Sequence, residues 1–369
     1  MDLTNVDLCK IPAGKSPDGQ YNFDDPVSLK PAILVVSIVL GAISIILTLG
    51  RTYMNRSNLR IADYTAITAC IINIGFTGDI LAQLNYARHQ WNIPVCWLTA
   101  SYFQLLYVQS TFFAPVFFAS KASIFLLYHQ LFGVHQHIKT AVTIGLIASG
   151  FLYIPNIALA AIFEAPSAGS TWESLLTADK SHKLVIWGII QSSLTVLLDF
   201  YIFFLPLPII IRLKMSLGRR LQLVAIFTTA LAGIVASVGS LAYRVILLHS
   251  DDRIWQQNIV TIFALVETNV AIIVSCMPAF AQMLKVHVTG SAAFKSFRTL
   301  LLGGSSNNTG ADSEDGVKDR TQLVTFGANQ TPRWRRYQEL SDTAILNTQT
   351  TAVDNKTTNT RDTTEGRDE

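Results

Sequence analysis

The chain has 369 residues, of which 50% are hydrophobic and only 14% are charged, and its formal net charge is +3. Soluble domains carry about 25% charged residues, so this composition excludes one large water-soluble core. The small net charge gives no indication of nucleic acid as a partner. Its four cysteines are scattered and form no CxxC pair, which gives no support to a zinc site or a redox motif.

Seven long apolar stretches, separated by short polar segments, are predicted to cross a lipid bilayer. About 20 residues suffice to span the hydrocarbon core as a helix. Such stretches must be helical, because in lipid each backbone amide needs a partner inside its own segment. The fold class is therefore an all-α membrane protein with a seven-transmembrane helix bundle. The predicted spans are 31–53, 62–82, a stretch within 101–132, 140–163, 184–211, 221–248 and 259–284.

The chain divides into three parts. Residues 1–30 form a short polar tail without the apolar core of a cleavable signal peptide, and 31–285 form the seven-helix domain. In 286–369, the stretch 291–302 spaces its apolar residues at helical intervals, which is typical either of an amphipathic helix on the inner leaflet or of a frayed linker. The remainder is rich in Ser, Thr, Asn, Asp and Gly and is predicted to be disordered.

Lysine and arginine near the span ends favour one orientation in the membrane. With the N-terminus outside, more of these cations fall on the inner side, most clearly in the loop that carries Arg212, Lys214, Arg219 and Arg220. We therefore expect an integral protein of the plasma membrane, with the N-terminus outside and the C-terminal tail in the cytoplasm. Cys9 and Cys96 then share the oxidising side, where they are either bridged to each other or free.

Short pieces along the chain carry a resemblance to a known family. They are RIADY at 60–64, KASIFLLYHQLF at 121–132, Asp199 followed by LPLP at 205–208, Trp255, ETNVA at 267–271 and CMP at 276–278. In this order and spacing they resemble the fungal rhodopsin-like domain family of seven-helix integral membrane proteins over 31–285. The resemblance implies a receptor-like protein that senses an unknown extracellular ligand. It would signal to a heterotrimeric G protein or another cytoplasmic partner.

The chain departs from this family's pattern at two positions. Ala62 stands where the family often has a second acidic residue, and Gln130 stands where arginine is usual. The second change removes a cation at the inner end of the third span, which puts the usual route of coupling in doubt.

Charged residues inside the spans are the best functional candidates, because an unpaired charge in lipid is costly. At ~1.5 Å per residue, Lys121 lies ~16 Å above the inner end of the third span and Asp199 ~20 Å above that of the fifth. The two spans are usually neighbours in seven-helix bundles, so we predict a buried Lys121–Asp199 ion pair. Its role is either structural or that of a lock broken on activation.

A second group of polar residues is predicted toward the outer half of the bundle. Asp79 and Glu267 are both placed ~25 Å above the inner boundary, within reach of Arg244 on the sixth span. These three form either the wall of an outward-facing pocket or a polar network that holds the bundle together. The aromatic residues expected beside them are Trp187, Tyr243 and Trp255, and Asn73 and Asn269 are expected to join through hydrogen bonds between helices.

Three functions stay open at this point. The first is the receptor-like protein, the second a transporter or channel with a polar pathway through Asp79, Glu267 and Arg244, and the third a membrane scaffold without a small ligand. No inverted repeat is evident, which counts against transport. No enzyme is predicted, since the chain has no HExxH, GxSxG or P-loop. No cofactor is expected, since a retinal Schiff base needs a lysine within 259–284 and there is none.

Overall fold

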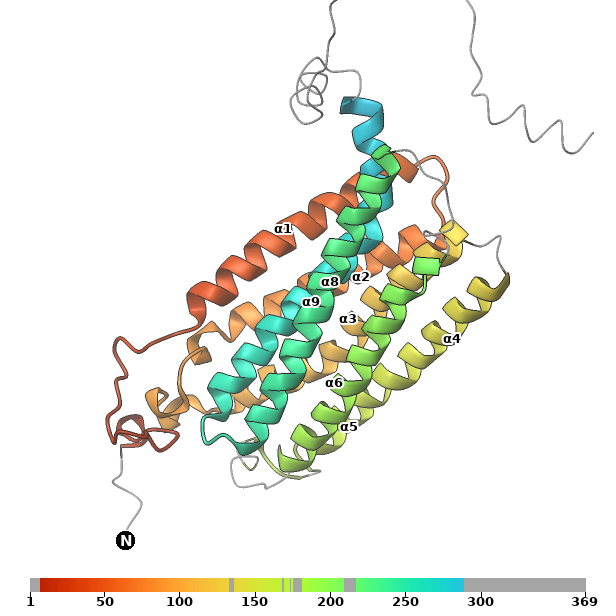
Figure 1. The fold of residues 1–369 in the computed structure, drawn as a ribbon. Helices are drawn as coiled ribbons and strands as arrows, with labels where there is room; N and C mark the ends of the chain where they lie inside the picture. Colours follow the sequence, from red (N-terminus) through yellow and green to blue (C-terminus); the bar gives the residue numbers. More distant parts are fainter. Residues whose placement is uncertain are drawn as a thin grey trace, which may run out of the picture. The chain divides into compact units, whose positions relative to one another are not determined.

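The computed structural model describes residues 7–132, 136–167, 169–172, 174, 181–208 and 217–288, and their side chains except those of 181–183, 217–226 and 284–288. Within these ranges the long elements are helices, and seven spans are long and apolar enough to cross a membrane, as predicted. The helices lie side by side in one bundle (Figure 1). They are α1 Lys30–Asn55, α2 Ile61–Ala82, α3 Ala100–Phe132, α4 Gln136–Tyr153, α5 Pro155–Phe163, α6 Ser181–Phe204, α8 Leu217–His249 and α9 Arg253–Val288.

The fourth span consists of two helices, which the sequence reading treated as one. α4 ends at Tyr153 and α5 begins at Pro155. Proline has no backbone N–H, and inside a helix its ring clashes with the carbonyl four residues earlier. The chain therefore starts a new helix at Pro155, where proline occupies the first position and costs nothing.

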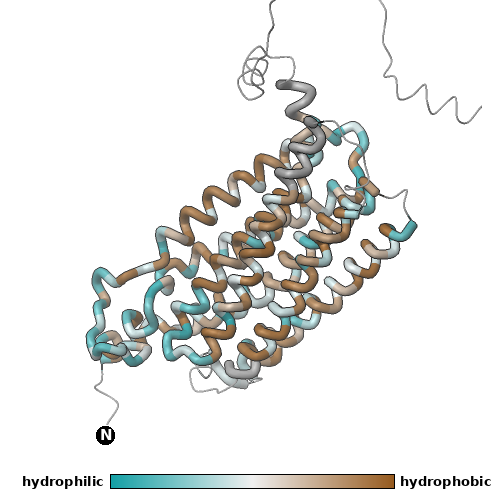
Figure 2. The backbone as a smooth tube through the Cα atoms, viewed as in Figure 1, coloured by the Kyte–Doolittle hydropathy of each residue, from teal (hydrophilic) through white to brown (hydrophobic). Residues whose placement is uncertain are grey.

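α9 is the most enclosed helix of the bundle and α3 the next. In α9, 78% of the apolar stretch is buried, against 22% in the span formed by α4 and α5. α9 packs against α8, α1 and α3, so side chains that it carries can meet several other helices. Apolar colour runs along the middles of the helices, and polar colour gathers in the segments that join them (Figure 2). Large apolar side chains on the outer face of α1 are exposed, as a lipid-facing surface requires; among them are Val35, Ile38, Ile46 and Leu49.

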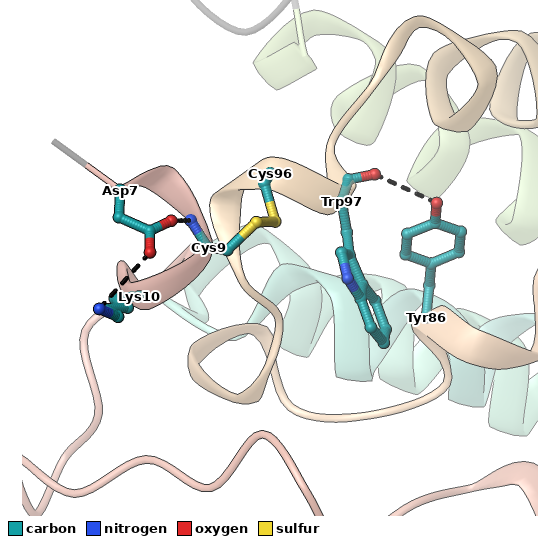
Figure 3. The surroundings of a disulfide bond; sticks show 6 residues. All are labelled: Asp7, Cys9, Lys10, Tyr86, Cys96 and Trp97. Atoms are coloured by element: carbon teal, nitrogen blue, oxygen red, sulfur yellow. Dashed lines mark hydrogen bonds and ion pairs between the residues drawn. A yellow bond between two sulfur atoms is a disulfide. The ribbon is translucent and has the colours of Figure 1, made fainter. Parts of the chain in front are cut away.

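The N-terminal segment is tied to the loop between α2 and α3. Cys9 and Cys96 form a disulfide with their Cα atoms 5.0 Å apart, so the bridged alternative is the one that the structure contains (Figure 3). The Ala13 amide donates to the Ile93 carbonyl at 2.8 Å, beside the disulfide. We call this end of the bundle the disulfide end.

At the opposite end, Arg51 joins three helices. Its Nε donates to Asp63 Oδ1 at 2.7 Å, and its Nη1 donates to the Ser275 carbonyl. Arg51 belongs to α1, and it is buried because Asp63 at the start of α2 neutralises it. The loop around Arg212 and Lys214, the stretch 291–302 and the remaining tail lie outside the described residues.

Candidate functional site

Three buried charges from three helices meet in the middle of the bundle. Lys121 on α3 donates hydrogen bonds to Asp199 Oδ1 on α6 and, at 2.8 Å, to Glu267 Oε1 on α9. The predicted Lys121–Asp199 pair is therefore confirmed as a contact. We call Lys121, Asp199 and Glu267 the central trio.

The third member of the trio corrects the sequence reading, which placed Glu267 with Asp79 and Arg244. The depths of Lys121 and Glu267 were counted from the inner ends of different helices. Those ends are not level, because the two residues are in contact although Lys121 lies 11 residues before Phe132, the last described residue of α3, and Glu267 lies 21 residues before Val288, the last of α9. Tilted helices of unequal length therefore bring together residues that such a count separates.

Asp79 does not line the cavity that Arg244 lines, so its predicted place in that pocket was wrong, whereas Arg244 and Glu267 do interact electrostatically. Asp79 Oδ2 instead accepts a hydrogen bond from Gln83 Nε2 at 2.9 Å, one turn further along. Gln83 supplies the partner that a buried carboxylate needs, and it does so without another helix.

Asn269 is the centre of a separate hydrogen-bond network between α1, α2 and α9. Its Oδ1 accepts from Ser44 Oγ and from Asn73 Nδ2, both at 3.0 Å, and its own Nδ2 donates to the Leu265 carbonyl at 2.8 Å. The predicted hydrogen bond between Asn73 and Asn269 is present, but it does not join the charged residues. These bonds satisfy the Asn269 side chain, which indicates a role in holding helices together.

A cavity of about 400 Å³ opens at the disulfide end. Its walls come from Phe76 of α2, the first half of α3, the end of α5, the starts of α6 and α9 and the end of α8. The volume falls in the usual range of small-molecule sites, ~300–1,000 Å³. Most of the wall is apolar and much of it aromatic: Phe76, Tyr102, Phe103, Phe113 and Phe163.

Of the residues predicted to line such a pocket, Arg244 and Trp187 do so and the others do not. Tyr243 instead lies against Phe263, with ring centroids 5.6 Å apart. Trp255 stacks on His89, with ring centroids 3.9 Å apart.

Three polar atoms in the cavity wall are buried and have no hydrogen-bond partner among the described residues. They are Arg244 Nε, Trp187 Nε1 and Glu164 Oε2. The Arg244 guanidinium lies 5.6 Å from the Phe113 ring centroid, in the position of a cation–π contact. Buried polar atoms are nearly always satisfied, so such a cluster in a cavity wall is typical of a binding site.

Glu164 was missed by sequence analysis. It follows the last residue of α5 and begins a polar loop, where an acidic side chain is normally solvated. Here burial raises the pKa of Glu164 to about 7, and the Ser110 hydroxyl opposes part of that rise. A signal was available, since Glu164 is the first charged residue after a long apolar run.

A histidine clasp joins the α2–α3 loop to the start of α9. His89 Nδ1 lies 2.6 Å from Asp252 Oδ2, and the His89 ring stacks between Trp91 and Trp255. The next residues of α9, Arg253 and Ile254, line the cavity. The clasp therefore fixes the position of one wall of the cavity. Within the part of the chain that the structure describes, no three His, Cys, Asp or Glu side chains are grouped to hold a metal ion.

Comparisons with known proteins agree with this architecture. The profile of a family described as Fungal rhodopsin domain matches residues 47–286. A SAT4 family membrane protein of Emericella nidulans is 26% identical over 259 residues, which is 69% of this chain and 63% of the relative. The match thus spans less than two thirds of that relative's length. No solved structure matches the chain.

Proposed function

Because the chain belongs to the fungal rhodopsin domain family of seven-span membrane proteins, we propose that it is a receptor-like protein whose bundle, 31–285, binds a small extracellular molecule and signals to the cytoplasm. One observation carries the proposal. The cavity at the disulfide end holds three buried polar atoms that no described residue satisfies. A ligand would satisfy them, whereas a scaffold has no use for them.

In this proposal the disulfide end faces the cell exterior, across the plasma membrane. Disulfides persist in oxidising compartments, so the Cys9–Cys96 bond supports this orientation. The C-terminal tail then lies in the cytoplasm, and its sequons at Asn307, Asn329 and Asn355 carry no glycan. Glycan found on any of them by mass spectrometry of the purified protein would reverse the orientation.

The central trio would transmit the binding event. Arg244 in the cavity wall interacts electrostatically with Glu267, and Glu267 bonds to Lys121. A ligand that draws the Arg244 charge toward itself weakens the attraction between Arg244 and Glu267. This change favours a different arrangement of α3, α6 and α9. The trio is thus proposed as a two-state lock, whose cytoplasmic reader is a heterotrimeric G protein or another signalling protein.

A fluorescent reporter tests the receptor proposal. Leu131, at the far end of α3, is exposed, so Leu131→Cys can carry an environment-sensitive dye, while Cys70 and Cys276 are buried. A compound that binds the cavity should change the dye's emission, and Lys121→Met should still bind it without that change. If a compound binds and the emission of the dye at residue 131 does not change in the protein with a wild-type trio, the receptor role is refuted.

The structure gives no separate support for transport. A pathway through Asp79, Glu267 and Arg244 would need these side chains in one channel, and Asp79 is bonded to Gln83 instead. Uptake of a cavity ligand into proteoliposomes would favour a transporter over a receptor.

A further inference from the structure

Two buried hydrogen-bond donors belong to residues that line the same cavity, Arg244 and Trp187. A Cβ placed on Gly188 would lie 2.6 Å from Arg244 Nη1, so the guanidinium crosses α6 where that helix has no side chain. The residue before it is Trp187, whose Nε1 is buried and unpartnered, like Arg244 Nε. The glycine therefore makes room for the arginine at the position that follows Trp187 in α6. Both Arg244 and Trp187 line the same cavity.

The Arg244 charge lacks a close counter-ion. Among the described side chains no carboxylate lies within 4.0 Å of it, because none of the described ion pairs includes Arg244. Glu267 bonds to Lys121, and it acts on Arg244 only as a more distant charge. A guanidinium enclosed by protein gains most from a carboxylate, which accepts two parallel N–H bonds in its plane.

The rest of the cavity requires an apolar molecule. Aromatic rings of α2 and α3, including those of Phe76 and Phe103, form much of the wall that is not polar. Burying an apolar body against such rings is favourable at ~25 cal/mol per Å² of surface removed from water. The ligand thus needs one acidic head and an apolar remainder.

We propose that the cavity binds an apolar monocarboxylate, with its head group held by Arg244 and Trp187. This rests on the proposed function, because it names the ligand class of the same cavity. It also gives the ligand a means of reaching the central trio, since its carboxylate replaces Glu267 as the main partner of the Arg244 charge.

Two series of probes of matched shape test the ligand class on the full chain in lipid nanodiscs, with empty nanodiscs as the blank. One is naphthylacetate with naphthylethanol and naphthylethylamine, and the other is decanoate with decanol and decylamine. At least one acid should bind saturably and at least about tenfold more tightly than its own alcohol and amine, because charge-assisted hydrogen bonds to Arg244 are lost in both.

Variants assign the head-group site. Arg244→Gln removes the charge, Trp187→Phe removes the indole donor, and Gly188→Ala keeps the charge but displaces the guanidinium. Each variant should reduce the ratio by which the acid binds more tightly than its alcohol and amine. Arg244→Gln should bring that ratio close to one. Arg56→Gln is the matched control, since Arg56 is an exposed arginine outside the cavity lining. It should keep the full preference. If Arg244→Gln does not fold, Gly188→Ala and Trp187→Phe decide whether the head group binds at this site.

Three results would overturn the ligand class: saturable binding of no acid, tighter binding of an amine than of its acid, or an acid preference that survives all three cavity variants. Amine binding that is lost in Glu164→Gln would move recognition to that carboxylate and leave the receptor proposal intact. Conversely, acid binding that depends on Arg244 but leaves the reporter at residue 131 unchanged would keep the ligand class and refute the receptor role.

Discussion

Lys121 Nζ lies 2.8 Å from Glu267 Oε1, so a cation on α3 is bonded to an acid on α9 while it also bonds to Asp199 on α6. One ammonium group thus serves two carboxylates, all three side chains being buried. The arrangement pairs charges that none of the three helices could pair alone. It also makes the relative positions of α3, α6 and α9 depend on one side chain.

Lys121→Met should destabilise the protein more than any other single change in the trio. It leaves Asp199 and Glu267 buried without a cation, and breaking a buried ion pair in this way costs about 3–5 kcal/mol. Thermal unfolding in detergent, monitored by size-exclusion chromatography, measures this loss of stability. The triple variant Lys121→Met, Asp199→Asn, Glu267→Gln should recover much of it, because none of the three positions of the trio then holds a buried charge. An unchanged unfolding temperature in Lys121→Met alone would show that the trio does not stabilise the bundle.

The four cysteines should divide into two classes. Cys9 and Cys96 are bonded to each other, whereas Cys70 and Cys276 are free and buried. A maleimide mass tag should therefore add to no cysteine in the folded protein, to two after denaturation, and to four after reduction and denaturation. Cys9→Ser should give three tags after denaturation alone, since it frees Cys96. Four tags without a reductant would mean that the disulfide is absent.

The spans and the Lys121–Asp199 pair could be predicted because each depends on a local signal. An apolar run of 20 residues needs no information from elsewhere in the chain, and a lone lysine within such a run demands an acid. The partner of Glu267 could not be predicted in the same way. Its depth relative to Lys121 depends on helix tilt and on the stagger of the helix ends, which are set by packing across the whole bundle.

The cavity was predicted in part, for a related physical reason. Arg244 and Trp187 were expected on its wall because both sit near the outer ends of their spans. Glu164 was not expected, because the sequence places it in a loop and only the fold encloses it. The α4–α5 break was not predicted. Pro155 marks its position, but a span with one proline often stays a single kinked helix.

Glu164 should make stability depend on pH near neutrality. Burial raises its pKa to about 7 from 4.5, so between these values the folded state holds a proton that the unfolded state has lost. The contribution of Glu164 therefore favours folding at about pH 4.5 and is lost as the pH rises through about 7. Thermal unfolding of the wild type and of Glu164→Gln across this range should show a difference that shrinks at the acidic end. A difference independent of pH would mean that folding does not raise the pKa of Glu164.

The histidine clasp should limit the local opening of α9 where that helix forms part of the cavity wall. Asp252 accepts from the Gln90 amide at 2.9 Å as well as pairing with His89, and the two tryptophan rings hold the His89 ring between them. His89→Ala removes both the stacking and the hydrogen bond to Asp252, whereas His89→Phe keeps only the stacking. Hydrogen–deuterium exchange at the start of α9, residues 253–257, should therefore rise in the order wild type, His89→Phe, His89→Ala. Affinity for a cavity ligand should fall in the same order, because the wall that includes Ile254 is less fixed. Equal exchange in all three proteins would show that the remaining contacts of α9 hold this wall without the clasp.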